Sequence, residues 1–314
     1  MKLLVLFAAL PLLGAASIPA QEAPVGHFRT WASSDRKALI FTSGGVTVQV
    51  EALPCPAKPP HSDDSSCSWE GYNNQAAVTV SALGLPSQRT LTDGASSYVR
   101  IAAVRLRRDD VRPAVVIDSE SGGSGGGSWI TVLAPDAGGY RSVELRRGEA
   151  GGGMDRNLQG QIGDNPIDRT GDGVVDFVVR DPRFDSAFGC NACTPRPPVV
   201  LSVVNGRAVD LSADSSARGV FAADMARLRA GCVSSQRGRN GICAAYVADA
   251  AHAGRFDAAW ATMLRHYQRD GATLWQGCVK PRLHGVCPSD GTTHHADFPA
   301  SLRAFLVATG YLTA

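Results

Sequence analysis

The sequence has few lysines and almost no net charge, and the lack of net charge excludes two classes of partner. Only four of its 31 basic residues are lysines, and the formal net charge is +2. A chain this close to neutrality lacks the basic surface that attracts nucleic acids and anionic membranes. We therefore expect neither as a partner, and we attribute the preference for arginine to genome composition.

Long apolar runs are absent beyond the first twenty residues. Residues 3–14 form an apolar stretch after Lys2, and small residues then lead to Ala20. This is the pattern of an export signal cleaved near Ala20, although cleavage a few residues earlier fits almost as well. The first cysteine is Cys55, so no lipid anchor is expected, and no later run is long enough to cross a bilayer. We predict a signal peptide over residues 1–20 and a periplasmic or secreted chain without a membrane span.

Eight cysteines in an exported chain indicate an oxidising compartment and four disulfide bonds. They lie in close pairs, and nearest-neighbour pairing is the simplest of the 105 possible connectivities. The predicted bonds are Cys55–Cys67, Cys190–Cys193, Cys232–Cys243 and Cys278–Cys287. Because each bond closes a short loop, we expect it to fix local structure more than the whole fold.

Strand candidates dominate the chain up to about residue 212. They combine β-branched or aromatic residues with alternation, and they are separated by turn residues. The candidates are residues 46–50, 77–83, 98–106, 115–118, 129–133, 140–145, 177–180, 199–204 and 208–211. Asn205-Gly206, between the last two, is the strongest hairpin signal in the chain.

The pattern changes to helical spacing after Ser212. Capping residues precede an apolar-periodic run there, and residues 242–253 have a helical composition. Phe256, Ala259, Trp260, Met263, Leu264 and Tyr267 lie on one helical face. A last helix begins after Asp297 and ends at Gly310. We therefore expect a β-rich domain over residues 21–212 and an α-helical domain over residues 213–314.

Two stretches of the β-rich part share one plan. Residues 112–145 and 173–212 each predict strand, long loop, strand, tight turn and strand, and an acidic loop precedes each. Repeated meanders are typical of propeller blades or stacked sheets, although any two meanders look alike. The expected fold class is α+β, with a propeller-like or sandwich β-domain followed by a small disulfide-stapled helical domain.

The segment "DRTGDGVVD" carries the clearest chemical signal. The candidate ligands are Asp168, Thr170, Asp172 and Asp176, at positions 1, 3, 5 and 9. Gly173 at position 6 permits a sharp turn, and Ca²⁺ prefers such hard oxygen ligands. Val179 stands where an EF-hand has glutamate, and a strand follows, so this is not an EF-hand. The alternative is a solvated Asp/Gly turn.

This pattern, D-x-x-G-D-G-x-x-D before an apolar strand, resembles the FG-GAP or VCBS-type repeat of extracellular β-propellers. Thr170 departs from the Asn or Asp usual in that repeat. A wider resemblance, to a group of uncharacterised exported bacterial proteins, covers residues 112–145, 171–212, 244–267 and 298–312. It implies the architecture and the compartment, but no activity and no catalytic residues.

Two further motifs have structural explanations. "GGSGGGSW" contains G-x-S-x-G around Ser124, but a nucleophile elbow needs a following helix and a strand is predicted instead. Cys190 and Cys193 form a C-x-x-C followed by a proline-rich stretch that cannot begin a helix, and no second such pair completes a zinc site. We interpret the first as a flexible loop and the second as a structural bridge.

The histidines near the end lack metal-ligand spacing. His284, His294 and His295, with Asp290, do not have the i, i+4 separation of a zincin helix. Because Cys278 and Cys287 bracket His284, we expect a bridged loop with surface histidines.

No catalytic and no cofactor-binding residue can be selected from the sequence, apart from the calcium ligands. We predict a non-enzymatic binding or envelope protein whose partner is an envelope or extracellular protein or a glycan. The alternatives are a periplasmic hydrolase and an inhibitor or chaperone of an envelope enzyme. An enzyme requires a pocket with convergent polar groups, whereas a binding protein exposes an apolar patch.

Overall fold

The computed structural model describes residues 20–35, 37–53, 75–92, 98–123, 126–148, 154–191, 194–269, 272–280 and 287–313. Several predictions fall outside these residues. They are the signal peptide up to residue 19, the Cys55–Cys67 bond, Ser124, Cys193 and His284.

The first layer, sheet I, is a five-stranded sheet in the order β1-β3-β4-β5-β6. Its strands are β1 (Gln21–Glu22), β3 (Leu39–Ser43), β4 (Val46–Ala52), β5 (Ala76–Ala82) and β6 (Gln88–Leu91). β3 to β6 form an antiparallel meander, and β1 pairs in parallel with β3. Valines at every second position of β4 are fully or almost fully buried, which gives this sheet one apolar face.

The second layer, sheet II, has the order β10-β9-β8-β7-β2 and is antiparallel. Its strands are β2 (Arg29–Ala32), β7 (Tyr98–Val104), β8 (Ala114–Glu120), β9 (Ser128–Asp136) and β10 (Gly139–Glu144). The 3₁₀ turn η1 (Ser33–Asp35) follows β2. β8 is buried on both faces: Val115 and Ile117 pack into the core against sheet I, and Val116 packs into a second core on the opposite side.

The third layer, sheet III, contributes the other side of that second core. It consists of β13 (Asp176–Arg180), β14 (Pro198–Val204) and β15 (Arg207–Asp210), all antiparallel. The short strands β11 (Arg147–Gly148) and β12 (Met154–Asp155) form a separate pair. Asn205 and Gly206 have positive φ values of 50° and 67°, as the predicted hairpin turn requires.

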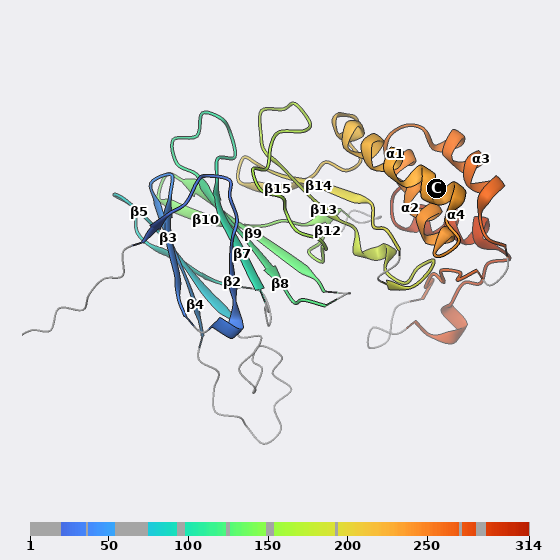
Figure 1. The fold of residues 1–314 in the computed structure, drawn as a ribbon, viewed down its shortest axis with the longest axis horizontal. Helices are drawn as coiled ribbons and strands as arrows, with labels where there is room; N and C mark the ends of the chain where they lie inside the picture. The colour runs from blue at the N-terminus through green and yellow to red at the C-terminus, as the bar shows by residue number, and fades with distance from the viewer. Residues whose placement is uncertain are drawn as a thin grey trace, which may run out of the picture.

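Helices cover the outer side of sheet III (Figure 1). They are α1 (Arg218–Ser234), α2 (Arg239–His252), α3 (Phe256–His266) and α4 (Phe298–Ala308), with the 3₁₀ turns η4 (Ser215–Ala217) and η5 (Ser289–Gly291). Val200 of β14 packs against Phe221 of α1, whereas its neighbours Val199 and Leu201 face sheet II. Asp297 caps α4 by accepting a hydrogen bond from the Ala300 amide, as predicted.

The predicted α+β class, with strands first and helices last, is confirmed. The two predicted repeats are the meanders β8–β10 and β13–β15, which pack face to face through one core. The described sheets form stacked open layers and do not close into a ring. The domain boundary at residue 212, between β15 and α1, stays a prediction. None of the described helices is long and apolar enough to cross a membrane.

Candidate functional site

The acidic loop before β13 is organised by its own carboxylates. Asp168 accepts hydrogen bonds from the amides of Gly171 and Gly173, at 2.6 and 2.8 Å. Asp176 Oδ2 accepts from the amides of Arg169 and Thr170, at 2.7 and 2.9 Å. Both glycines have φ above 80°, a conformation that other residues rarely adopt. The loop is therefore a closed turn with its acidic side chains directed at the backbone.

Two oxygens of this loop are buried without a hydrogen-bond partner. They are Thr170 Oγ1 and Asp176 Oδ1, and Asp176 is only 1 % exposed. Burial raises the pKa of Asp176 above its usual range, against the lowering effects of the two amide hydrogen bonds and of the Thr170 side chain. The amides of Gly173 and Gly171 lower the pKa of Asp168. Unpaired buried oxygens at positions 3 and 9 fit a hard cation.

A complete set of carboxylate ligands is not assembled in the described part of the chain. No three His, Cys, Asp or Glu side chains there are grouped as metal ligands. Asp172, the remaining predicted ligand, accepts a hydrogen bond from the Val174 amide at 2.8 Å. A cation would therefore need Thr170, main-chain or water oxygens as well, and the calcium site stays a prediction.

The loop also joins sheet II to sheet III. Val174 forms an isolated bridge with Arg107, and the Val175 amide donates to the Leu106 carbonyl at 2.8 Å. Leu106 and Arg107 follow β7 of sheet II, and Val175 precedes β13 of sheet III. These contacts tie the end of the acidic loop, where β13 begins, to the segment that follows β7 of sheet II.

A buried ion-pair network connects sheet III to the helices. Asp181, directly after β13, is fully buried and accepts hydrogen bonds from Arg183, including Nη2 to Oδ2 at 2.5 Å. Tyr311 donates its hydroxyl to Asp181 at 3.0 Å, and Arg183 also donates to the Thr309 carbonyl beyond α4. Burial alone would raise the pKa of Asp181, but the hydrogen bonds and charge of Arg183 lower it. The pair therefore stays ionised.

A small cavity, the junction cavity, lies beside this network. Its volume is about 220 Å³, and its lining includes Arg183, Asp210, His252 and Tyr311. Burial lowers the pKa of His252 to about 4, so its ring is neutral at pH 7. Asp210 accepts hydrogen bonds from the amides of Gly148 and Ser212 at 2.5 and 2.9 Å, and no hydrogen bond joins His252 to a hydroxyl or thiol among the lining residues. Asp210 is therefore held by main-chain amides, and the charge of Arg183 is balanced by Asp181.

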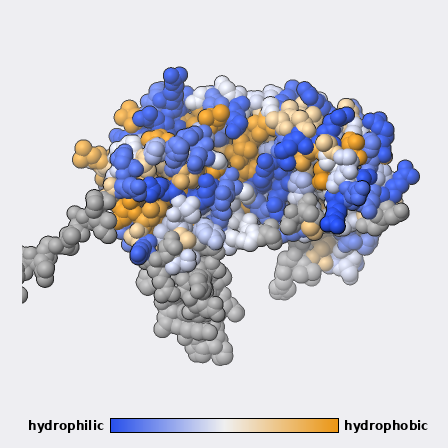
Figure 2. All heavy atoms as spheres, in the orientation of Figure 1, coloured by the Kyte–Doolittle hydropathy of each residue, from blue (hydrophilic) through white to orange (hydrophobic). Residues whose placement is uncertain are grey.

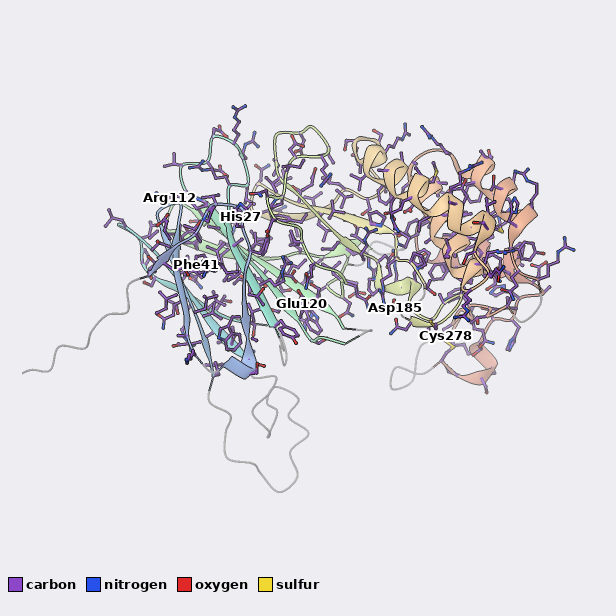
Figure 3. The ribbon with its side chains drawn as sticks, in the orientation of Figure 1. His27, Phe41, Arg112, Glu120, Asp185 and Cys278 are labelled. Carbon is purple, nitrogen blue, oxygen red and sulfur yellow. A yellow bond between two sulfur atoms is a disulfide. The ribbon has the colours of Figure 1, made fainter. Side chains whose placement is uncertain are left out.

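A larger hollow, the Trp129 cleft, shares Arg147 and Arg183 with the junction cavity. Its volume is about 550 Å³. Its lining residues are Ser121, Gly127, Trp129, Arg147, Asp155, Asn157, Leu158, Gln159, Pro182, Arg183 and Asp185. Arg147 donates to Asp155 at 2.6 Å, and Gln159 and Arg196 both donate to Asp185. Asp185 lies where the strands meet the helices (Figure 3). The cleft thus combines apolar and polar lining residues, and its charged groups have partners, although Arg147 Nε and Nη1 are buried without a hydrogen bond.

Two further carboxyl groups are buried. Asp118 of β8 accepts a hydrogen bond from the Ser128 hydroxyl, and Arg100 lies 3.6 Å from its other oxygen, yet burial raises its pKa to about 7. Asp249 of α2 lies near Asp224 of α1, and burial followed by the Asp224 charge raises its pKa well above the usual range. Both buried acids therefore hold a proton under conditions in which exposed carboxyls are ionised.

The remaining motifs behave as structural elements. The structure forms the predicted disulfides Cys232–Cys243 and Cys278–Cys287. Cys190 is disulfide-bonded, but its predicted bond to Cys193 stays a prediction because Cys193 lies outside the described residues. His295 stacks on Trp275 with ring centroids 6.1 Å apart.

The junction residues could not be selected from the sequence. Arg147 and Tyr311 lie far along the chain from the Asp181–Arg183 segment, and each of these residues is an ordinary type. The one local signal is Asp181 before Pro182, which is the capping pattern of the 3₁₀ turn η2 (Pro182–Phe184).

Comparisons with known proteins find relatives whose activities are not defined. A family model described as "sll0997 C-terminal domain" matches residues 221–310, which contain most of α1 and all of α2 to α4. The chain is 28 % identical over 229 residues to the "Probable thylakoid lumen protein sll0997" of Synechocystis sp., covering 71 % of this chain and 64 % of that protein. It is 24 % identical over 299 residues to the "Uncharacterized protein y4bJ" of Sinorhizobium fredii, covering 93 % of this chain and 43 % of that protein.

The chain thus spans less than two thirds of the length of either relative. No solved structure matches it. These relatives agree with the expected resemblance to uncharacterised proteins, and one of them is named as a probable thylakoid lumen protein, whereas the FG-GAP or VCBS resemblance of the acidic loop stays a prediction.

Proposed function

We propose that the chain is an extracytoplasmic, non-enzymatic binding protein of the cell envelope, periplasmic or secreted, with one calcium-stabilised loop. Disulfides such as Cys232–Cys243 persist in oxidising compartments outside the cytoplasm. The name of one relative places that protein in the thylakoid lumen, which is also outside the cytoplasm. The partner would be an envelope or extracellular protein or a glycan.

The observation that carries the binding function is the pairing of charges around an open cleft. In the Trp129 cleft, Arg147 pairs with Asp155, and Asp185 is held by Gln159 and Arg196. Charged groups fixed in this way are preorganised to bind. General acid–base catalysis needs instead a group free to exchange its proton with a substrate.

A calcium ion in the acidic loop would draw its oxygens from Asp168, Thr170, Asp172 and Asp176. Its chemistry would be structural, because Ca²⁺ neutralises clustered carboxylates and satisfies the buried oxygens of Thr170 and Asp176. Through the contact of Val174 with Arg107, a fixed loop would secure β13, which leads directly to Asp181.

An envelope hydrolase is the second candidate. The junction cavity brings His252, Tyr311 and Asp210 together, as convergent polar groups of an active site would be. An inhibitor or chaperone of an envelope enzyme would belong to the binding class and would use the same surfaces.

Thermal unfolding in CaCl₂ and in EGTA tests the loop. At a calcium concentration of 100 times Kd, the folded state gains about 2.7 kcal/mol. We expect Asp172→Asn to lose this rise in Tm, and Asp109→Asn, with its side chain 89 % exposed, to keep it. An unchanged calcium response in Asp172→Asn defeats the calcium assignment. Capture of envelope components with and without EGTA then tests whether the loop supports binding.

A further inference from the structure

We propose that the Trp129 cleft binds a neutral saccharide. This inference rests on the proposed binding function and names its ligand class. The argument uses the aromatic wall, the charge balance and the size of the cleft.

Trp129 provides the aromatic wall. It is the second residue of β9, it is partly exposed, and it lines the cleft. A Cβ atom placed on Gly127 would lie 3.2 Å from the Trp129 ring, so the ring packs closely against the glycine backbone. An indole held in one orientation presents a flat apolar face and an N–H donor, the combination that suits a ligand with one apolar and one polar side. Sugar rings have such faces.

The charges of the cleft are balanced. Arg147 is paired with Asp155 at 2.6 Å, Arg183 with Asp181 at 2.5 Å, and Asp185 with Arg196. A charged ligand would add an unbalanced charge to this set, whereas Arg147 Nε and Nη1, which are buried without a hydrogen-bond partner, can donate to uncharged ligand oxygens. The cleft therefore favours an uncharged ligand.

The paired groups can still bind hydroxyls. A carboxylate has about four acceptor sites, so Asp155 and Asp185 keep capacity beyond their present partners. Hydroxyl donors to such anchored carboxylates form charge-assisted hydrogen bonds. The exposed Asn157 adds an amide that both donates and accepts. Many hydroxyls on an uncharged ring define a saccharide.

The cleft has the size of a small-ligand site, and hydrophobic residues on the face of the molecule shown in Figure 2 lie in separate groups among hydrophilic ones. The volume of about 550 Å³ lies within the usual range for small-ligand sites.

Titration calorimetry and ¹⁵N-HSQC spectra of the full chain would test the inference. The probes are cellotriose and chitotriose, with trigalacturonate as the charged counterpart and N-acetyl-trialanine amide as an uncharged peptide. We expect a neutral trisaccharide to shift the indole resonance that Trp129→Phe removes. Trp129→Ala removes the ring on which the sugar would stack, so it should weaken binding about tenfold or more.

Matched variants separate binding from folding. Gly127→Ala, which displaces the ring, should weaken binding several-fold while the Tm changes little, and Asn157→Ala should do the same. Trp260→Ala, on α3 where Trp260 stacks on Phe256, should keep full affinity. Binding by neither trisaccharide, undiminished binding in Trp129→Ala, or tighter binding of trigalacturonate or the peptide would overturn the inference. EGTA and Asp172→Asn act only on the acidic loop. If no saccharide binds the cleft, the calcium test and the envelope capture still decide the proposed function on their own.

Discussion

Asp118 gives the sharpest stability prediction, because its pKa is raised to about 7 by burial in sheet II. In the unfolded chain the carboxyl ionises near its usual value of 3.8, whereas in the folded chain it keeps its proton until about pH 7. A raised folded pKa stabilises the folded state fully below pH 3.8, and this contribution is lost as the pH rises towards 7.

The size of the effect follows from the two pKa values. At 1.36 kcal/mol per pKa unit, the whole loss is about 4 kcal/mol, of which about 2.5 kcal/mol falls between pH 5 and pH 8. Asp118→Asn keeps an oxygen that can accept the Ser128 hydrogen bond but removes the titration. The free energy of unfolding of the variant, relative to that of the wild type, should therefore rise by about 2.5 kcal/mol between pH 5 and pH 8.

Urea unfolding of both proteins at pH 5, 6, 7 and 8 measures this difference, and the comparison cancels the other titrating groups. Asp136→Asn, at an exposed turn, is the control and should run parallel to the wild type. Parallel curves for Asp118→Asn and the wild type would refute the reasoning, because Asp118 would then ionise equally in both states.

Two further predictions concern the junction and the helical part. Arg183→Ala leaves the fully buried Asp181 without its main partner. We therefore expect the free energy of unfolding, measured by chemical denaturation, to fall by about 3–5 kcal/mol. A Tm within a degree of the wild type would contradict the role assigned to Arg183. The Cys232→Ser/Cys243→Ser double variant removes a disulfide between residues 11 apart in the sequence. Because the unfolded chain gains loop entropy, the free energy of unfolding should fall by about 3 kcal/mol. An unchanged denaturation midpoint would show that the bond does not restrain the unfolded chain.

Elements with strong periodicity could be predicted from the sequence. The valines of β4 alternate, the helical face from Phe256 gives α3, and Asp297 caps α4 where expected. Strand β8 was predicted over residues 115–118 but extends over Ala114–Glu120, since the polar Ser119 beyond the predicted end is also buried.

The short edge strands were missed for a physical reason. β6 reads Gln-Arg-Thr-Leu and alternates between half-buried and exposed residues, and β1 has only two residues. Such strands owe their conformation to hydrogen bonds with a neighbouring strand, which local sequence does not reveal.

One candidate site could be predicted from local sequence, and the other could not. The acidic loop could be found because its four predicted ligands lie within nine residues of sequence. The Trp129 cleft could not, because Trp129 of β9, Asn157 after β12 and Asp185 after η2 meet only when sheets II and III stack.

Equilibrium dialysis against ⁴⁵Ca²⁺ tests most directly the proposal that the acidic loop before β13 binds calcium. We predict one bound ion per wild-type chain and none per Asp176→Asn chain, with the Asp109→Asn control unchanged. No bound calcium in the wild type, or equal binding in the Asp176→Asn variant, would contradict the account.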